Sequence, residues 1–148
     1  MMIETDVLYA YVKPSDWLKI VAGVLINKID GGELGLVYSS REVFHELYYV
    51  SVEEGVSIDE YIKRVASLTA INNLKFLDTT AEIDLLAFTL MKQYRITSVF
   101  DAYYAATALN QVPDHTIIST DEVFDKIPGI VRLAPDELIS SKPSEGNF

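Results

Sequence analysis

The sequence contains no cysteine and only two histidines among its 148 residues. Without cysteine the chain has no disulfide, no thiolate nucleophile and no cysteine-based zinc site. Any metal ion must then be held mainly by oxygen atoms, which favours hard divalent cations. The sequence also lacks an apolar run of the ~18 residues that a membrane span needs, and its first residues lack the basic start of a signal peptide. We therefore expect a soluble, cytoplasmic protein.

Basic residues are scarce: 12 lysines and arginines face 22 acidic residues, which gives a net charge of −10. This charge does not suit passive nucleic-acid binding, in which basic side chains neutralise phosphates. It suits an acidic site that attracts divalent cations, which in turn receive a phosphate, and equally a basic partner protein. An RNA bound by this chain would be positioned by a dimer groove, a partner or local basic residues such as Lys13, Lys19, Arg41 and Lys92.

The length and the 49% hydrophobic content predict one well-filled domain. Five segments rich in β-branched and aliphatic residues predict strands: Met2–Val12, Leu34–Tyr38, Leu74–Leu77, Thr116–Ser119 and Ile130–Leu133. Helical spacing or capping residues predict the segments between them: Pro14–Asp30, Ser39 or Ser40 to Gly55, Ser57–Leu68, Thr80–Tyr94, Ser98–Asn110 and a short turn at Asp121–Lys126. Strands alternating with helices predict a parallel sheet covered on both faces, a three-layer α/β/α sandwich over residues 1–134, followed by a polar, flexible tail over 135–148.

Four acidic positions fall at the expected carboxyl ends of strands or beside them, where open α/β sheets bind ligands. Glu4 and Asp6 lie two residues apart in the first predicted strand and would share one face of it. Asp121 follows the fourth predicted strand, and Asp101 lies near the start of a helix that should pack close by. Asp101 and Asp121 also have a purely structural interpretation, because acids are favoured in the first turn or at the N-cap of a helix.

Glu46 lies on or beside the apolar stripe of its predicted helix, with Val43 three residues before it and Val50 four residues after it. A carboxylate in that position is costly unless it is paired or hydrogen-bonded. The structural alternative is a residue at the rim of the stripe that reaches solvent or pairs with Arg41. The two histidines, His45 and His115, lie far apart in the chain, and a lone histidine beside a helix stripe is more often structural than a ligand, so we assign neither to a site.

Four segments, taken in order, resemble the motifs of PIN-domain nucleases, and especially of the VapC-type toxins. ETDVLYAYV resembles the D-T-N-V-L opening of the family, and SREVFHEL resembles its serine followed six residues later by glutamate, here Ser40 and Glu46. SVFDAYYAATAL resembles the D-A-x-x-A-A-x-A-L helix, and STDEVFDKIPG resembles the T-x-D-x-D-F segment. The match in order and spacing covers Met2 to Leu133.

The resemblance implies metal-dependent hydrolysis of RNA phosphodiester bonds, regulated by an antitoxin protein, and a homodimer is expected. It implies Mg²⁺ or Mn²⁺ as the cofactor, because the implied ligands are all oxygens. Glu46, Asp101 and Asp121 take the places of the second, third and fourth acids, and the first acid falls on Glu4, with Asp6 two residues on. In this assignment Glu4, Asp6, Asp101 and Asp121 hold the metal, Glu46 orients the ligands or the attacking water, and Ser119 hydrogen-bonds a ligand or the substrate phosphate.

The chain departs from the family pattern at three places: Glu4 replaces aspartate, Ser119 replaces threonine, and Val123 replaces the second acid of the last motif. These departures leave a second interpretation, a PIN-like binding or scaffold module with weak or no cleavage. A third interpretation is a phosphoacceptor receiver domain, with Asp78 as the acceptor after the Leu74–Leu77 strand. It fits poorly, because that family has a lysine after its last strand, where this chain has Ala134 and a proline.

Overall fold

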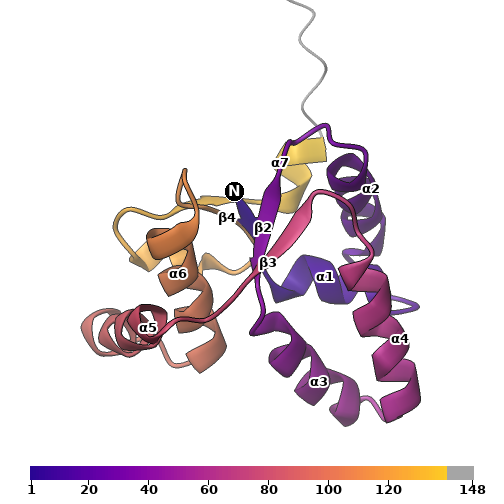
Figure 1. Cartoon of the computed structure of the whole chain (residues 1–148), viewed down its shortest axis with the longest axis horizontal. Coiled ribbons are helices and arrows are strands. Elements are labelled where there is room, and N and C mark those ends of the chain that lie inside the picture. The colour runs from indigo at the N-terminus through magenta and orange to yellow at the C-terminus, as the bar shows by residue number, and fades with distance from the viewer. Residues whose placement is uncertain (140–148) are drawn as a thin grey trace, which may run out of the picture.

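The computed structural model describes residues 1–139, which contain one five-stranded, fully parallel sheet in the order β3–β2–β1–β4–β5 (Figure 1). The strands are β1 (Met2–Ile3), β2 (Val37–Ser40), β3 (Leu74–Leu77), β4 (Thr116–Ile118) and β5 (Val131–Leu133). The chain builds the sheet outward from β1 to β3 on one side and then crosses to β4 on the other. The order therefore reverses between β1 and β4, and such a reversal is where open α/β sheets form a binding crevice.

Helices cover both faces of the sheet, which confirms the predicted three-layer sandwich. They are α1 (Thr5–Val12), α2 (Lys19–Asp30), α3 (Val43–Glu53), α4 (Ile58–Thr69), α5 (Ala81–Tyr94), α6 (Val99–Gln111), the 3₁₀ helix η1 (Glu122–Lys126) and α7 (Pro135–Ile139). Figure 1 shows α5 and α6 on one side of the sheet and α1, α2 and α4 on the other. Within residues 1–139, no helix has the length and apolar content to cross a membrane.

Helix α6 lies close against the sheet because its inward face is built mainly of alanine. Its alanines are completely buried, at positions Ala102, Ala105, Ala106 and Ala108. Small side chains let the helix axis approach the sheet, as the sequence predicts, and they bring the start of α6 to the carboxyl ends of the central strands. The larger Tyr104 is also fully buried and points its hydroxyl toward α1 and α3, where it bonds Thr5 and Glu46.

The first predicted strand is wrong beyond its second residue. Only Met2–Ile3 pair in the sheet, and residues Thr5–Val12 form α1. The Glu4 carboxylate accepts a hydrogen bond from the Asp6 amide at 3.1 Å and so acts as the N-cap that turns the chain into a helix. A short, continuous apolar run does not distinguish a buried strand from a buried helix, and the pattern was therefore assigned to a strand although most of the segment is helical. Glu4 and Asp6 therefore do not share a strand face.

Two further boundaries differ from those predicted. Helix α2 begins at Lys19 rather than Pro14, because the Asp16 carboxylate accepts a bond from the Leu18 amide at 2.9 Å and holds a turn before it. Trp17 and Ile20, whose spacing suggested the buried face of this helix, are exposed instead, at 81% and 83%. Ser39 and Ser40 were predicted to cap a helix, but they end strand β2 instead. Helix α3 starts at Val43, three residues after Ser40.

The first five residues of the predicted tail are helical. Residues Pro135–Ile139 form α7, which packs against α2, and Pro135 is buried. The Lys28 amine donates to the Leu138 carbonyl at 3.4 Å. The rest of the predicted tail, residues 140–148, lies outside the described residues.

Candidate active site

All five acids singled out from the sequence line one cleft at the carboxyl ends of β1 and β4. The cleft has a volume of about 320 Å³. Its lining comes from β1–α1, α3, the start of α6 and the β4–η1 loop: Glu4, Thr5, Asp6, Tyr9, Glu46, Val50, Ser98, Asp101, Thr120 and Asp121. None of these lining residues is a lysine, arginine or histidine. The cleft is therefore a concentration of negative charge that no side chain of its wall neutralises.

Glu4 is the deepest of the acids. It is only 4% exposed, and its Oε1 accepts from the Asp6 amide at 3.1 Å and from the Ser119 hydroxyl at 3.2 Å. The same Ser119 oxygen accepts from the Asp121 amide at 2.9 Å. The buried Ser119 hydroxyl therefore links the Glu4 carboxylate, after β1, to the backbone amide of Asp121, after β4. Ser119 itself has no exposed surface, so its contacts are with the acids rather than with the cleft opening.

Asp6 is held by the loop that follows β4. Its Oδ2 accepts from both the amide and the hydroxyl of Thr120, at 2.6 and 2.7 Å, and its Oδ1 accepts from the Val7 amide at 2.7 Å. Thr120 lines the cleft, although the sequence interpretation did not single it out. Its neighbour Ser119 was singled out because it occupies the threonine position of the resembled motif.

Asp101 and Asp121 lie where the structural interpretation of the sequence also placed them. Ser98 caps α6 by accepting from the Asp101 amide at 3.3 Å, which puts Asp101 in the first turn of the helix. Asp121 is the N-cap of η1, and its Oδ1 accepts from the Val123 amide at 2.9 Å. Both acids line the cleft as well. The capping role and the place in the cleft therefore coexist, because the two helix starts themselves form the cleft wall.

Glu46 is oriented by a buried hydrogen-bond chain that sequence reasoning missed. The Thr5 hydroxyl donates to the Tyr104 hydroxyl at 2.7 Å, and Tyr104 donates to Glu46 Oε1 at 3.1 Å. Burial and the nearby Glu46 raise the pKa of Tyr104, so its hydroxyl keeps its proton and remains a donor. The sequence analysis did not single out Tyr104, because nothing in the sequence indicated its distant partners Thr5 and Glu46.

The acids raise one another's affinity for protons. Burial raises the pKa of Asp101 to about 7, with further contributions from Asp121, Glu46 and Asp6. Burial also raises the pKa of Glu46, to which Asp6 and Asp121 add. The pKa of Glu4 lies well above its ordinary value, because of burial first and then its contacts with Asp6. At neutral pH the cleft therefore favours either protons or a bound cation.

The donor set of the cleft fits a hard divalent cation. Its ionisable lining consists of carboxylates and one tyrosine, and carboxylate oxygens are the ligands that Mg²⁺ and Mn²⁺ prefer. Within residues 1–139, no three Asp, Glu or His side chains already stand in the geometry of a formed metal site. Asp101 and Asp121 are partly exposed at the cleft, whereas Glu4 is buried and bonded.

Arg132 of β5, which the sequence analysis also did not single out, holds the backbone beside the site. Its guanidinium donates to the Ser119 carbonyl at 3.1 Å and makes two parallel bonds with the Asp125 carboxylate, both at 3.0 Å. The paired bonds fix the plane of the guanidinium. Arg132 therefore holds the backbone of Ser119, whose hydroxyl joins Glu4 to Asp121.

The model of one protein family, the PIN domain, matches residues 1–130 of this chain. The chain belongs to the PIN domain family. No match was found among curated proteins.

Solved structures share this PIN fold at low sequence identity. VapC20 of Mycobacterium tuberculosis, described as a sarcin-ricin loop cleaving toxin, is 15% identical, with a TM-score of 0.67 over 84% of this chain and 92% of that one. VapBC2 of Rickettsia felis, bound to a promoter DNA fragment, is 15% identical with a TM-score of 0.67, over 90% and 96% of the two chains. A toxin-antitoxin complex of Klebsiella pneumoniae is 17% identical with a TM-score of 0.60, over 90% and 96%.

The match to the PIN family argues against the receiver-domain interpretation. Asp78, its would-be phosphoacceptor, is absent from the cleft lining, and its side chain is 87% exposed and pairs with Arg41 at 3.4 Å. Val123, which stands where the resembled PIN motif has a second acid, is not part of the cleft lining either.

Proposed function

We propose that this PIN domain is a Mg²⁺- or Mn²⁺-dependent endoribonuclease that hydrolyses RNA phosphodiester bonds in the cytoplasm, as the toxin of a toxin-antitoxin pair. The observation that carries the proposal is the convergence of five carboxylates, from four separate segments of the chain, on one cleft without a basic residue in its wall. A metal-free cleft of this kind is poor at binding a phosphate, because both carry negative charge. A divalent cation reverses the local charge.

In this proposal Asp101, Asp121 and the Glu4–Asp6 pair hold the cation. When bound, the cation would supply a positive charge for a phosphate oxygen and lower the pKa of a coordinated water. Thr120 fixes Asp6, and Ser119 fixes Glu4, so that these acids need little reorganisation on binding. The buried position of Ser119 favours this holding role over contact with the substrate.

Glu46 orients the ligands or the attacking water. Its bond from Tyr104 leaves it fixed at one oxygen while it still lines the cleft. A raised pKa makes the Glu46 carboxylate a stronger base, which suits a general base beside the attacking water. No protein nucleophile is required for this hydrolysis.

The test is cleavage of purified RNA by the purified chain with Mg²⁺, with EDTA and an Asp101→Asn variant as controls. We expect cleavage with Mg²⁺, none with EDTA and none with the variant. Equal cleavage by the variant would overturn the assignment of Asp101.

The second candidate is a PIN-fold binding module without cleavage. The observation that favours it is the burial of Glu4, which stands where the family has an aspartate and whose Oε1 already accepts two hydrogen bonds. Calorimetric titration with Mn²⁺ separates the two candidates. A binding isotherm together with cleavage supports the nuclease, whereas no heat and no cleavage support the module.

We also propose an antitoxin partner and a homodimer. Two of the structural neighbours are toxin-antitoxin assemblies, and an acidic chain suits a partner with basic segments. Large apolar side chains are available on the surface for such contacts, among them Trp17 and Ile20 beside α2 and Tyr49 and Val52 on α3. Size-exclusion chromatography with light scattering tests the dimer, and co-purification with the product of a small adjacent reading frame tests the antitoxin.

A further inference from the structure

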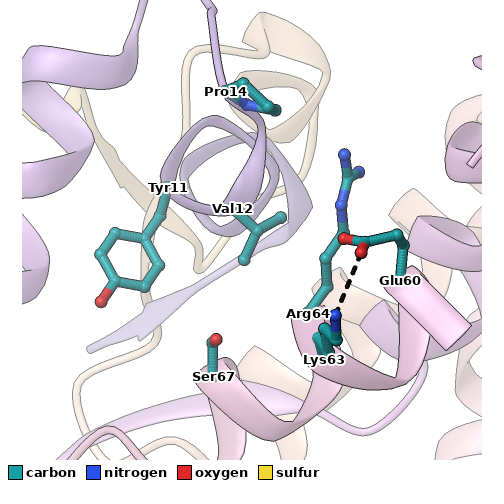
Figure 2. Close-up of a pocket in the computed structure, with 7 residues that line it drawn as sticks. All are labelled: Tyr11, Val12, Pro14, Glu60, Lys63, Arg64 and Ser67. Carbon is teal, nitrogen blue, oxygen red and sulfur yellow. Dashed lines mark hydrogen bonds and ion pairs between the residues drawn. The ribbon is translucent and has the colours of Figure 1, made fainter.

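A second cavity, of about 400 Å³, lies between the end of α1 and helix α4 and is separate from the acidic cleft. Figure 2 shows its two walls. One wall comes from the end of α1 and the turn after it, with Tyr11, Val12 and Pro14; the other comes from α4, with Lys63, Arg64 and Ser67. The cavity therefore combines an apolar and aromatic side with two basic residues, two residues that carry hydroxyls and one acidic residue, Glu60. Its volume lies within the ordinary range for small-ligand sites.

Arg64 is the unusual member of this lining. Its guanidinium donates to the buried Ser51 hydroxyl at 3.2 Å, and within residues 1–139 it forms no ion pair with a carboxylate. Of the other three arginines, Arg41 and Arg132 each pair with an aspartate, and Arg95 is exposed. Acids outnumber bases 22 to 12 in this chain, so a partly buried arginine without a carboxylate partner is unexpected.

The single bond to Ser51 fixes the Arg64 side chain without neutralising it. A guanidinium carries five N–H donors, and a serine hydroxyl satisfies one of them. Lys63 contributes less net charge, because it pairs with Glu60, a further residue of the lining, at 3.3 Å (Figure 2). The free positive charge of the cavity therefore belongs to Arg64.

The cavity continues the wall of the acidic cleft along α1. Tyr9 lines the cleft and Val12 lines the cavity, three residues later on the same face of the helix, about 4.5 Å further along the axis. Lys13 lies over the Tyr9 ring, 5.2 Å from its centroid, and pairs with Glu54 at 2.9 Å. The cleft and the cavity therefore share α1 as a wall.

We propose that the cavity between α1 and α4 is a nucleotide subsite, which binds one nucleotide of the RNA strand outside the cleaved bond, with its phosphate on Arg64. This inference rests on the proposed ribonuclease function. It answers a difficulty of that function, since a chain with a net charge of −10 needs a local cation to position RNA. The basic residues suggested from the sequence for positioning RNA did not include Arg64.

The lining favours a nucleotide over an acidic peptide. A guanidinium binds a phosphate through two parallel N–H bonds, and the Ser67 and Tyr11 hydroxyls add neutral donors of the kind common in phosphate and sugar contacts. The Tyr11 ring, Val12 and Pro14 give an apolar side suited to contact with a sugar or base. A carboxylate side chain would use the guanidinium and leave this apolar side without a partner.

The test measures binding of a short, fluorescein-labelled, single-stranded oligoribonucleotide of mixed sequence to the full chain, by anisotropy in EDTA so that no cleavage occurs. We expect Arg64→Gln to weaken binding about tenfold, because it removes a charge-assisted contact. The slope of log affinity against log salt should fall by about 0.7, the value for one phosphate of a single strand. Lys75→Gln removes the same charge from the exposed edge strand β3, outside both the cavity and the cleft, and should change the affinity less than twofold.

Arg64→Lys keeps the charge and loses the paired N–H geometry, so it should bind with intermediate affinity. It also serves as the test variant if Arg64→Gln fails to fold. Equal affinities for wild type and both Arg64 variants, or equal losses for the Arg64 and Lys75 variants, would overturn the subsite. Arg64-dependent binding that an oligoglutamate peptide abolishes at equal charge concentration would also overturn it, in favour of an acidic peptide.

Cleavage in Mg²⁺ is measured separately, which distinguishes the two proposals. Loss of cleavage in Asp101→Asn with Arg64-dependent binding intact supports both. Arg64-dependent binding by a wild-type chain that cleaves nothing supports the subsite and overturns the ribonuclease. Cleavage by a wild-type chain whose binding is independent of Arg64 supports the ribonuclease and overturns the subsite.

Discussion

Thr120 donates two hydrogen bonds to a single oxygen of Asp6, from its amide at 2.6 Å and from its hydroxyl at 2.7 Å. The two residues follow β4 and β1, which are neighbours in the sheet but are far apart in the sequence. The contact therefore closes the gap between the two strands where the order of the sheet reverses. It also sets the position of one acid of the cleft from the opposite side.

Thr120→Val should weaken Mn²⁺ binding and Mg²⁺-dependent cleavage by about tenfold, the lower end of the effects seen when a residue supporting a metal ligand is removed. Valine keeps the shape of threonine but loses the hydroxyl, while the amide bond to Asp6 remains. Thr120→Ser retains the hydroxyl and should keep most of the activity. Calorimetry with Mn²⁺ and cleavage rates measure both effects, and equal losses in the two variants would contradict this role.

Asp101→Asn should reduce cleavage by more than about 100-fold, since loss of a direct ligand should exceed the loss from removing a supporting residue. In EDTA at about pH 8 the same variant should unfold at a higher temperature than wild type, because it removes a carboxylate that its acidic neighbours and burial disfavour. A gain of 1 kcal/mol corresponds to about 2–4 °C for a chain of this size. A variant that is both inactive and markedly less stable would indicate a structural role instead.

The parts of the site that the sequence predicted are those whose signal is local. Asp101 and Asp121 each follow a recognisable capping pattern, and Glu46 interrupts an apolar stripe, so each stands out within its own segment. Sheet topology then brings the segments together, because all parallel strands end at the same edge. Helix starts at Ser57 and Ser98 were predictable for the same reason, since each serine accepts a bond from the backbone of its own helix.

The parts that the sequence did not predict depend on partners distant along the chain. Tyr104 bonds Glu46 across 58 residues, and Arg132 bonds the Ser119 carbonyl across 13. No local pattern distinguishes such a tyrosine or arginine from any other residue on a buried or surface face. The error at α1 has a different origin, because its short apolar run suits a buried strand and a buried helix equally well.

Tyr104→Phe should lower the cleavage rate about tenfold at saturating RNA while leaving the KM for RNA nearly unchanged. Phenylalanine fills the same buried volume, but Glu46 loses the hydroxyl that orients it and Thr5 loses its acceptor. The unpaired groups should also cost about 1–2 kcal/mol of folding free energy. Steady-state kinetics and thermal unfolding measure the two effects. A loss of stability with an unchanged rate would show that Tyr104 serves packing alone.

Metal-free protein should lose stability as the pH rises from about 4 to about 7. The pKa of Asp101 is raised from 3.8 to about 7, and those of Glu4 and Glu46 are also raised, so the folded chain holds these protons more tightly than the unfolded chain does. The stabilisation is complete below the unfolded pKa and is lost as the pH rises through the folded one. Asp114 has a lowered pKa and therefore acts in the opposite sense, as the pH falls below about 4, so a comparison at about pH 5 and about pH 8 avoids its effect.

Thermal unfolding in EDTA should accordingly show a lower midpoint at about pH 8 than at about pH 5. In Asp101→Asn the difference between the two midpoints should shrink, because the variant lacks the carboxylate that ionises over this interval. Adding Mg²⁺ at about pH 8 should raise the wild-type midpoint, since a cation that binds only the folded cleft stabilises it in proportion to the logarithm of its concentration. A wild-type midpoint that rises between the two pH values, or that does not respond to Mg²⁺, would contradict a cleft strained by its own negative charge.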